Sequence, residues 1–309
     1  MDNYSIRVVE KIIVLFIAMI AGYIAKKGKI LSVENTKALS SLLVYITNPC
    51  LIICSLQINY DKNVIIVAGC IFALSFAIHT FLAIFSHFIF KAVKEKSERN
   101  VYAFALTYSN CGYMGYPLMM AIFGDEIGLF YGVIFTTVFN LFTWTHGVII
   151  MSNENKISWK KLIYNPALIS VILSIILFIS RIRLPKTIND GLSLVGDMTF
   201  PLSMIIIGSL LADMKLRQIL SQKKLYVFSA LRLLIVPAAM MAVSILLGLP
   251  DYLSIIGITM CAAPVAANTA VTAEVYGNNS ALAAKLVGIT TMFCLITMPF
   301  ILWLSQLVI

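Results

Sequence analysis

Midway through the apolar residues 101–123 stands the stretch Ser109-Asn110-Cys111-Gly112-Tyr113-Met114-Gly115-Tyr116-Pro117. A chain that crosses lipid should satisfy its backbone hydrogen bonds within its own helix. Pro117 has no N–H, so the carbonyl of Tyr113 loses its helical partner. Gly112 and Gly115 let the chain leave helical geometry at little steric cost. Freed carbonyls at membrane depth need a protein cover or a cavity, so the stretch predicts a broken helix at a binding site. A proline kink packed in a helix bundle is the alternative.

A second apolar span, residues 255–275, is interrupted in a similar way. Pro264 frees the carbonyl of Met260, and Asn268 falls one helical turn further on. The alanines around Pro264 allow another backbone to come close. Two interrupted spans at corresponding places in two halves of a chain are the best sequence-level indication of a transport site.

The composition is that of a polytopic membrane protein. Of the 309 residues, 60% are hydrophobic and 12% are charged, which is about half the charged fraction of a soluble domain. The net charge of +9 comes from basic residues scattered over short loops. This pattern fits loops that face an anionic lipid bilayer, and it does not suggest nucleic acid as a partner. The six cysteines fall inside apolar spans, so no disulfide framework is expected.

The apolar segments predict an all-α membrane protein with ten transmembrane helices. Most of them reach the roughly 20 residues that cross a bilayer, and the sixth is short. Their approximate bounds are 8–25, 37–56, 64–90, 101–123, 129–151, 166–179, 188–211, 225–247, 253–275 and 281–307.

The basic residues predict which side each loop faces. Loops after spans one, three, five and seven carry 15 of the 23 Lys and Arg residues, and the opposite side carries 6. Cytoplasmic loops are enriched in Lys and Arg, so we expect a multi-pass protein of the cytoplasmic membrane with both termini outside.

An internal repeat divides the chain. Ser41-Leu42, Thr47 and Pro49 match Ser193-Leu194, Thr199 and Pro201 at a constant shift of 152 residues. Each half holds five spans, an odd number, so the second copy must enter the membrane upside down. The sequence therefore predicts two inverted five-helix repeats, residues 1–151 and 165–309, joined by a cytoplasmic loop of residues 152–164.

The two interrupted spans resemble those of the auxin efflux carrier family. The matching residues are Ser109-Asn110-x-Gly112-Tyr113-x-Gly115-Tyr116-Pro117-Leu118, Ala263-Pro264-Val265-Ala266, Thr272-Ala273-Glu274-x-Tyr276-Gly277, Thr297 and Pro299. The resemblance covers the whole chain. The family includes plant auxin exporters and bacterial permeases described for malate and malonate. The plant Asn-Pro-Asn signature at the first break is absent here, as is the long central loop.

The resemblance also implies an architecture similar to that of bile-acid/sodium symporters. In that architecture spans one, two, six and seven form a scaffold. Spans three to five and eight to ten form a mobile transport domain, in which broken helices four and nine cross.

No enzyme or metal site is predicted, and no cofactor is expected. His79, His87 and His146 are dispersed and lack the spacing of metal ligands. The chain has no Gly-x-Ser-x-Gly nucleophile motif.

Asn110 and Asn268 are the leading candidates for substrate binding. An amide offers two donors and two acceptor lone pairs, and it can bind a carboxylate without burying a permanent charge. An amide hydrogen bond between helices is the alternative. We expect the site where the half-helix N-termini of spans four and nine converge. The predicted set comprises Asn110, Cys111, Gly112, Gly115, Tyr116, Pro117, Pro264, Asn268, Thr269, Asn48 and Asn140.

Asp197 is the coupling candidate, because it lies several residues inside span seven. Ionisable residues at membrane depth are functional candidates by default. Asp197 could carry a coupling proton or contact a coupling ion, and H⁺ and Na⁺ both stay open. A structural pair with Arg232 or with a polar neighbour is the alternative.

These patterns favour a secondary transporter that moves a small organic anion by alternating access, and the resemblance implies that the movement is of the elevator type. A sodium-coupled symporter of the bile-acid class and a membrane receptor that binds without transport are the alternatives. Sodium dependence of uptake would distinguish the sodium-coupled symporter from the proposed carrier. Counterflow would distinguish a transporter from a receptor that only binds. A homodimer is one option for the assembly.

Overall fold

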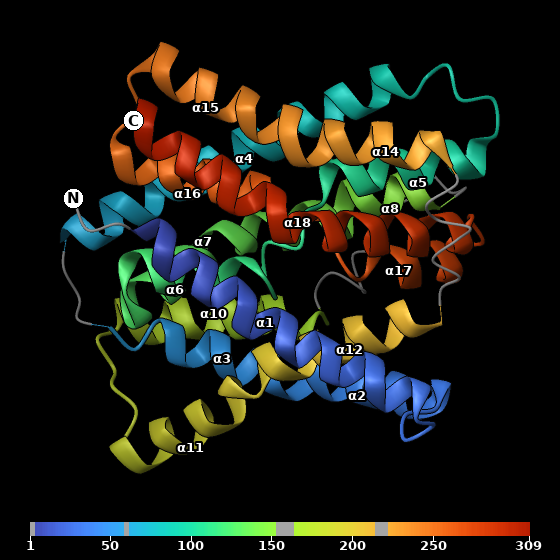
Figure 1. Cartoon of the computed structure of the whole chain (residues 1–309). Helices are drawn as coiled ribbons and strands as arrows, with labels where there is room; N and C mark the ends of the chain where they lie inside the picture. Colours follow the sequence, from blue (N-terminus) through green and yellow to red (C-terminus); the bar gives the residue numbers. More distant parts are fainter. Residues whose placement is uncertain (1–3, 59–61, 153–163, 214–221) are drawn as a thin grey trace.

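The computed structural model describes residues 4–58, 62–152, 164–213 and 222–309, and every regular element in these ranges is helical (Figure 1). The helices are α1 Tyr4–Lys27, α2 Val33–Leu42, α3 Asn48–Ser55, α4 Lys62–Ile89, α5 Lys96–Thr107, α6 Gly115–Phe123, α7 Asp125–Phe142, α8 Val148–Met151, α10 Pro166–Ile179, α11 Lys186–Asp197, α12 Thr199–Ala212, α14 Lys223–Ala230, α15 Val236–Leu247, α16 Asp251–Ala262, α17 Thr269–Val275 and α18 Ser280–Val308. The all-α class is confirmed.

Three π-helical segments join consecutive helices: η1 Leu43–Thr47, η2 Thr143–Gly147 and η3 Leu231–Ile235. η1 and η3 are each followed by a proline in the first turn of the next helix, Pro49 in α3 and Pro237 in α15. A proline inside a helix removes one N–H donor. The wider π turn accommodates this loss, and such turns are frequent at functional sites.

Within the described residues, seven continuous helical segments are long and apolar enough to cross a membrane. They span residues 6–27, 33–55, 62–89, 125–151, 186–212, 223–247 and 280–308. The chain is therefore a multi-span membrane protein. The remaining three expected spans differ for physical reasons. The fourth and ninth are each split into two shorter helices, and the sixth, α10, has only 14 residues. At 1.5 Å per residue α10 is about 21 Å long, less than the roughly 30 Å hydrocarbon core.

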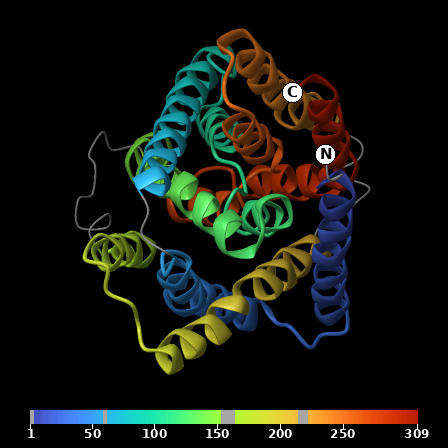
Figure 2. The same ribbon diagram turned by 90° about the vertical axis from the view of Figure 1, so that its left-hand side faces the viewer.

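The helices form two groups, which Figure 2 shows one below the other. In the lower group α1 lies along α12, and α3 packs against α10 and α11. The contact of α1 with α12 is close because of two glycines. A Cβ atom on Gly22 would overlap the carbonyl of Ile205, and one on Gly208 would overlap the carbonyl of Met19. The upper group holds α4 to α8 and α14 to α18.

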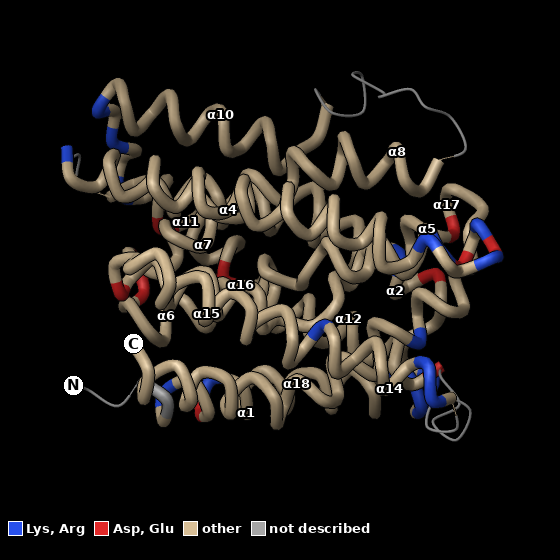
Figure 3. The backbone as a smooth tube through the Cα atoms, turned by 90° about the horizontal axis from the view of Figure 1, so that it is seen from above, with Lys and Arg blue, Asp and Glu red and all other residues tan. Residues whose placement is uncertain are grey.

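Large apolar side chains are exposed on the outer faces of many helices, among them Ile17, Phe81, Leu246 and Ile296. Exposed apolar surface of this extent is expected where lipid surrounds the protein. α1 begins and α18 ends at one end of the molecule (Figure 1), and many Lys and Arg residues gather near α2, α5 and α14 at the other (Figure 3). Most of the predicted connecting loop, residues 153–163, lies outside the described residues.

Candidate functional site

In the first broken span the helix ends several residues before Pro117, the residue from which the break was predicted. α5 ends at Thr107 and α6 begins at Gly115, so residues 108–114 leave the helix. Pro117 lies in the first turn of α6, where its missing N–H costs no helical hydrogen bond. The expectation that Pro117 itself opens the helix is corrected. The boundary lies at Tyr108, whose backbone is extended (φ −107°, ψ 110°).

The second broken span opens at its proline, as predicted. α16 ends at Ala262 and α17 begins at Thr269. Ala263, which precedes Pro264, is extended (φ −62°, ψ 146°). A proline ring disfavours helical geometry in the residue before it, so the local sequence is sufficient to end α16 here.

The two breaks pair with each other. The N–H of Asn110 donates to the carbonyl of Pro264 at 2.7 Å, and the N–H of Ala266 donates to the carbonyl of Tyr108 at 3.0 Å. Ser109 and Val265 thereby form an antiparallel bridge. The N–H of Val265 donates to the hydroxyl of Thr290 in α18 at 3.1 Å. Backbone groups that have left a helix deep in the protein are thus satisfied by the opposite break.

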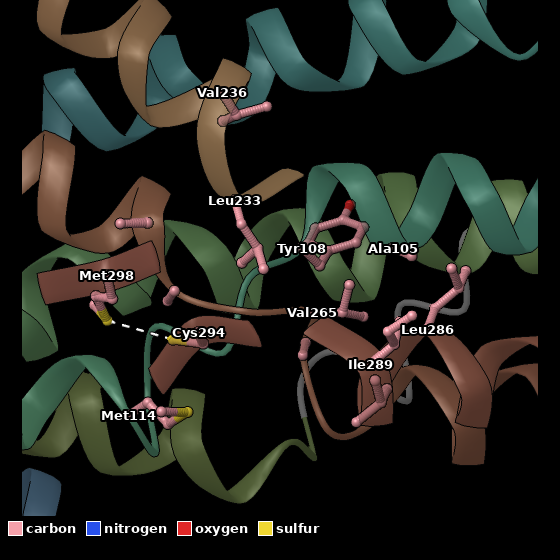
Figure 4. Close-up of a cluster of buried hydrophobic side chains, with 14 of the residues drawn as sticks. Ala105, Tyr108, Met114, Leu233, Val236, Val265, Leu286, Ile289, Cys294 and Met298 are labelled. Carbon is pink, nitrogen blue, oxygen red and sulfur yellow. Dashed lines mark hydrogen bonds between the residues drawn. The ribbon is translucent and has the colours of Figure 1, made fainter. Parts of the chain in front are cut away.

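An apolar cluster holds this pair in place. Tyr108 and Val265, one from each break, lie among side chains of η3 and α18 that include Leu233, Leu286 and Ile289 (Figure 4). All five side chains are buried. Close packing of this kind fixes the relative position of the two breaks.

Asn110 presents an unpartnered donor beside the pair. Its side chain is 4% exposed, and its Nδ2 has no hydrogen-bond partner. Its backbone carbonyl accepts from the N–H groups of Met114 and Gly115 at 3.2 and 3.3 Å. A buried donor without a partner costs about 1–3 kcal/mol. Such a group in a native structure needs an explanation, and ligand binding is one.

Arg232 places a guanidinium at the end of α16. Its side chain is 1% exposed, and its Nη1 donates to the carbonyl of Cys261 at 2.6 Å. Its Nε has no hydrogen-bond partner. The side chains of Cys111, Cys261 and Cys294 lie in its neighbourhood. Among the described residues no carboxylate forms an ion pair with it. Burying an unpaired charge costs several kcal/mol.

The alternative pairing of Asp197 with Arg232 is therefore not formed. Asp197 is exposed at the end of α11, and Arg232 is buried in η3. Arg232 was not among the predicted site residues, although its position inside span eight was a signal. Intramembrane cations are rare and usually functional.

The residues that follow Asn110 differ in their structural roles. Neither Gly112 nor Gly115 has a positive φ. Gly115 allows close approach, because a Cβ there would lie 2.7 Å from the sulfur of Met260 in α16. A Cβ on Gly112 would meet only open space. The hydroxyl of Tyr116 shares a hydrogen bond of 2.5 Å with that of Thr136 in α7.

The other predicted site residues do not all gather around the paired breaks. Asn268 lies in the second break but is exposed, and its side chain does not cap α17. Thr269 is fully buried, and its hydroxyl has no partner. Asn48 and Asn140 lie in α3 and α7, and no hydrogen bond in the described part of the chain ties their side chains to the paired breaks. Cys111 and Pro117 are buried with Asn110. No cluster of three His, Cys, Asp or Glu residues within the described ranges could hold a metal ion.

Comparisons with known proteins agree on the class of molecule. The profile of the family described as membrane transport protein matches residues 7–302. An uncharacterized transporter of Methanocaldococcus jannaschii is 26% identical in an alignment that covers 96% of this chain and 98% of the relative. Both matches are long enough to include the two breaks.

Proposed function

The chain belongs to the membrane transport protein family, that of the auxin efflux carriers, and from this premise we propose that it moves a small organic anion across the cytoplasmic membrane by alternating access. One observation carries the proposal. Two broken segments pair in the buried centre, beside donors of Asn110 and Arg232 that have no partner.

The chemistry of these donors favours a carboxylate. The amide of Asn110 and the guanidinium of Arg232 both donate hydrogen bonds, and a guanidinium matches the planar geometry of a carboxylate. A bound carboxylate would also compensate the buried charge of Arg232, with which no acidic side chain in the described part of the chain forms an ion pair. The open space beside Gly112 and the hydroxyl of Thr269 would complete the site.

The packing supports an elevator-type motion. The proposed scaffold is the lower group, α1 to α3 and α10 to α12, in which Gly22 and Gly208 lock α1 against α12. The proposed transport domain is the upper group, α4 to α8 and α14 to α18, which contains both breaks. In this proposal the paired breaks cross at the substrate site and move with their domain, while the scaffold stays fixed.

One hydrogen bond supports the inverted repeat of ten spans. Thr199 donates to Thr47 through their hydroxyls at 3.1 Å, and the two residues are 152 positions apart. This is the shift that relates the two halves in the sequence. A residue that touches its own counterpart is expected on the axis of a twofold repeat. The proposed repeats are residues 1–151 and 165–309, counting the split and short helices as spans.

Coupling is the least constrained part of the proposal. Asp197 lies in the proposed scaffold and is exposed at the end of α11, which suits a role in coupling more than in substrate contact. We propose H⁺ or Na⁺ as the coupling ion. Uptake measured with and without sodium separates a proton-coupled carrier from a symporter of the bile-acid class.

Transport by purified protein in proteoliposomes tests the proposal. A thermal-shift screen with malate, malonate and indole-3-acetate first identifies a carboxylate that binds. Counterflow of that compound should then be observed. Binding without counterflow would favour a receptor, and the absence of any binding among carboxylates would contradict the anion site.

The sidedness also follows from the proposal, with extracellular termini and a cytoplasmic connecting loop. Single cysteines introduced at Asn3 and at Ser158 should differ in intact cells. An impermeant thiol reagent should label the first and not the second. Labelling at Ser158 would show that the connecting loop is extracellular and that the proposed topology is wrong.

A further inference from the structure

A basic cavity lies apart from the paired breaks, at the end of the molecule where Lys and Arg gather. Its volume is about 350 Å³, and it is formed by the end of α4, the beginning of α5 and the end of α8. Lys91, Lys96 and Arg99 line it together with His87 and His146. Among the described residues that line it there is no Asp or Glu. The cavity thus concentrates positive charge, which favours an anion with several acceptor oxygens, such as a phosphate group.

Lipid is the source of phosphate that the surroundings favour. The outer face of α4 exposes Phe81, Ile84 and Phe88, whose side chains are 60%, 55% and 66% exposed. Their spacing places them on one stripe of the helix, and this stripe ends close to Lys91. From Phe81 to Ile89, the last residue of α4, the helix rises about 12 Å, and Lys91 follows two residues later. An acyl chain could lie along this stripe while its phosphate occupies the cavity.

We propose that this cavity binds the phosphate of an anionic phospholipid, with the acyl chain against the outer face of α4. Basic pockets between transmembrane helices bind such head groups in other membrane proteins. The inference does not depend on the proposed transport function, since none of the residues that line the cavity belongs to the proposed substrate site.

The cavity is nevertheless linked to the first break. Thr107, the last residue of α5, donates to the hydroxyl of Ser86 at 3.2 Å, and Ser86 lines the cavity. The ring of His146 shares a hydrogen bond of 2.9 Å with the hydroxyl of Tyr108. A lipid held here therefore contacts the elements that position the first break, and it should stabilise the fold around it.

Lipid titrations of the purified protein test this inference. Wild type in detergent is titrated with phosphatidylglycerol, with phosphatidylcholine and with inorganic phosphate, and binding is followed by thermal shift and native mass spectrometry. The site variant is Lys96→Gln/Arg99→Gln. The matched control is Lys223→Gln/Lys224→Gln, which removes two exposed cations from α14 that do not line the cavity.

Phosphatidylglycerol should bind wild type and the control variant alike, and its affinity for the site variant should fall at least tenfold. Lys91→Gln, which lies beyond the end of α4, provides a second variant if the first is not monodisperse. Equal affinity in the site and control variants would overturn the site. Saturable binding of inorganic phosphate that is equally sensitive to Lys96 and Arg99, without a preference for the lipid, would overturn the lipid as its occupant.

Discussion

Replacing Arg232 with Gln separates a role in anion binding from a structural role. A glutamine amide still offers a donor but carries no charge, and its nitrogen lies two bonds short of the Nη1 that donates to the carbonyl of Cys261 at 2.6 Å. The substitution therefore keeps a polar side chain near the end of α16 and removes the guanidinium. Arg232→Lys is the companion variant, because it retains the charge and loses the planar geometry and the Nε donor.

The expected magnitude follows from the environment of this side chain. A hydrogen bond to a charged group contributes about 1.5–3 kcal/mol, and about 1.4 kcal/mol corresponds to a tenfold change in affinity. Arg232→Gln should therefore weaken carboxylate binding by roughly ten- to hundredfold. Its effect on the stability of the protein without substrate should be small or favourable, because the substitution removes a buried charge that no carboxylate among the described residues compensates.

Calorimetry with malonate and with its neutral diamide, malonamide, gives the readout. Wild type should prefer malonate, Arg232→Gln should lose this preference, and Arg232→Lys should keep part of it. If Arg232 has only a structural role, the opposite result is expected: Arg232→Gln lowers the melting temperature and leaves the preference for malonate over malonamide unchanged. That result would refute the assignment of Arg232 to the substrate.

Five other substitutions, grouped in three predictions, test the remaining parts of the proposal. Asn110→Ala should weaken malonate binding about tenfold or more, because its buried Nδ2 has no other partner. Asn268→Ala should weaken it less, because this side chain is exposed. If calorimetry shows the larger loss of affinity for Asn268→Ala, the site lies closer to α17. Gly208→Ala should lower the melting temperature, because its Cβ would overlap the backbone of Met19, whereas Gly191→Ala, with nothing near its Cβ, should be neutral or stabilising by up to about 1 kcal/mol. Asp197→Asn should change the pH dependence of proteoliposome transport with little change in malonate affinity; an unaltered pH profile with reduced stability would leave Asp197 a structural role.

The two broken spans show how far local sequence rules extend. Pro264 marks the second break correctly, because a proline constrains the residue before it. Pro117 marks the first break only approximately. There the helix ends at Thr107, where the carbonyl of Tyr108 meets the N–H of Ala266. That hydrogen bond joins residues far apart in the sequence, so no property of the first span alone could have located it.

The site shows the same division between local and long-range information. Asn110 could be predicted, because a polar amide beside a helix break is unusual in an apolar span. Arg232 was not predicted as a site residue, because its depth in span eight does not reveal which elements it faces. Only the folded chain places it at the end of α16 and leaves Asp197 on the exposed surface. The direction of a side chain in a bundle is a tertiary property.

The buried charge of Arg232 also bears on the energetics of the proposed cycle. If the transport domain moves with Arg232 and a bound monocarboxylate, the pair carries no net charge. Without the anion, the same movement carries one positive charge, and each elementary charge moved across the membrane potential involves about 2.3 kcal/mol per 100 mV. Movement of the loaded domain should therefore be insensitive to the membrane potential, whereas movement of the empty domain should depend on it, favoured in one direction and opposed in the other.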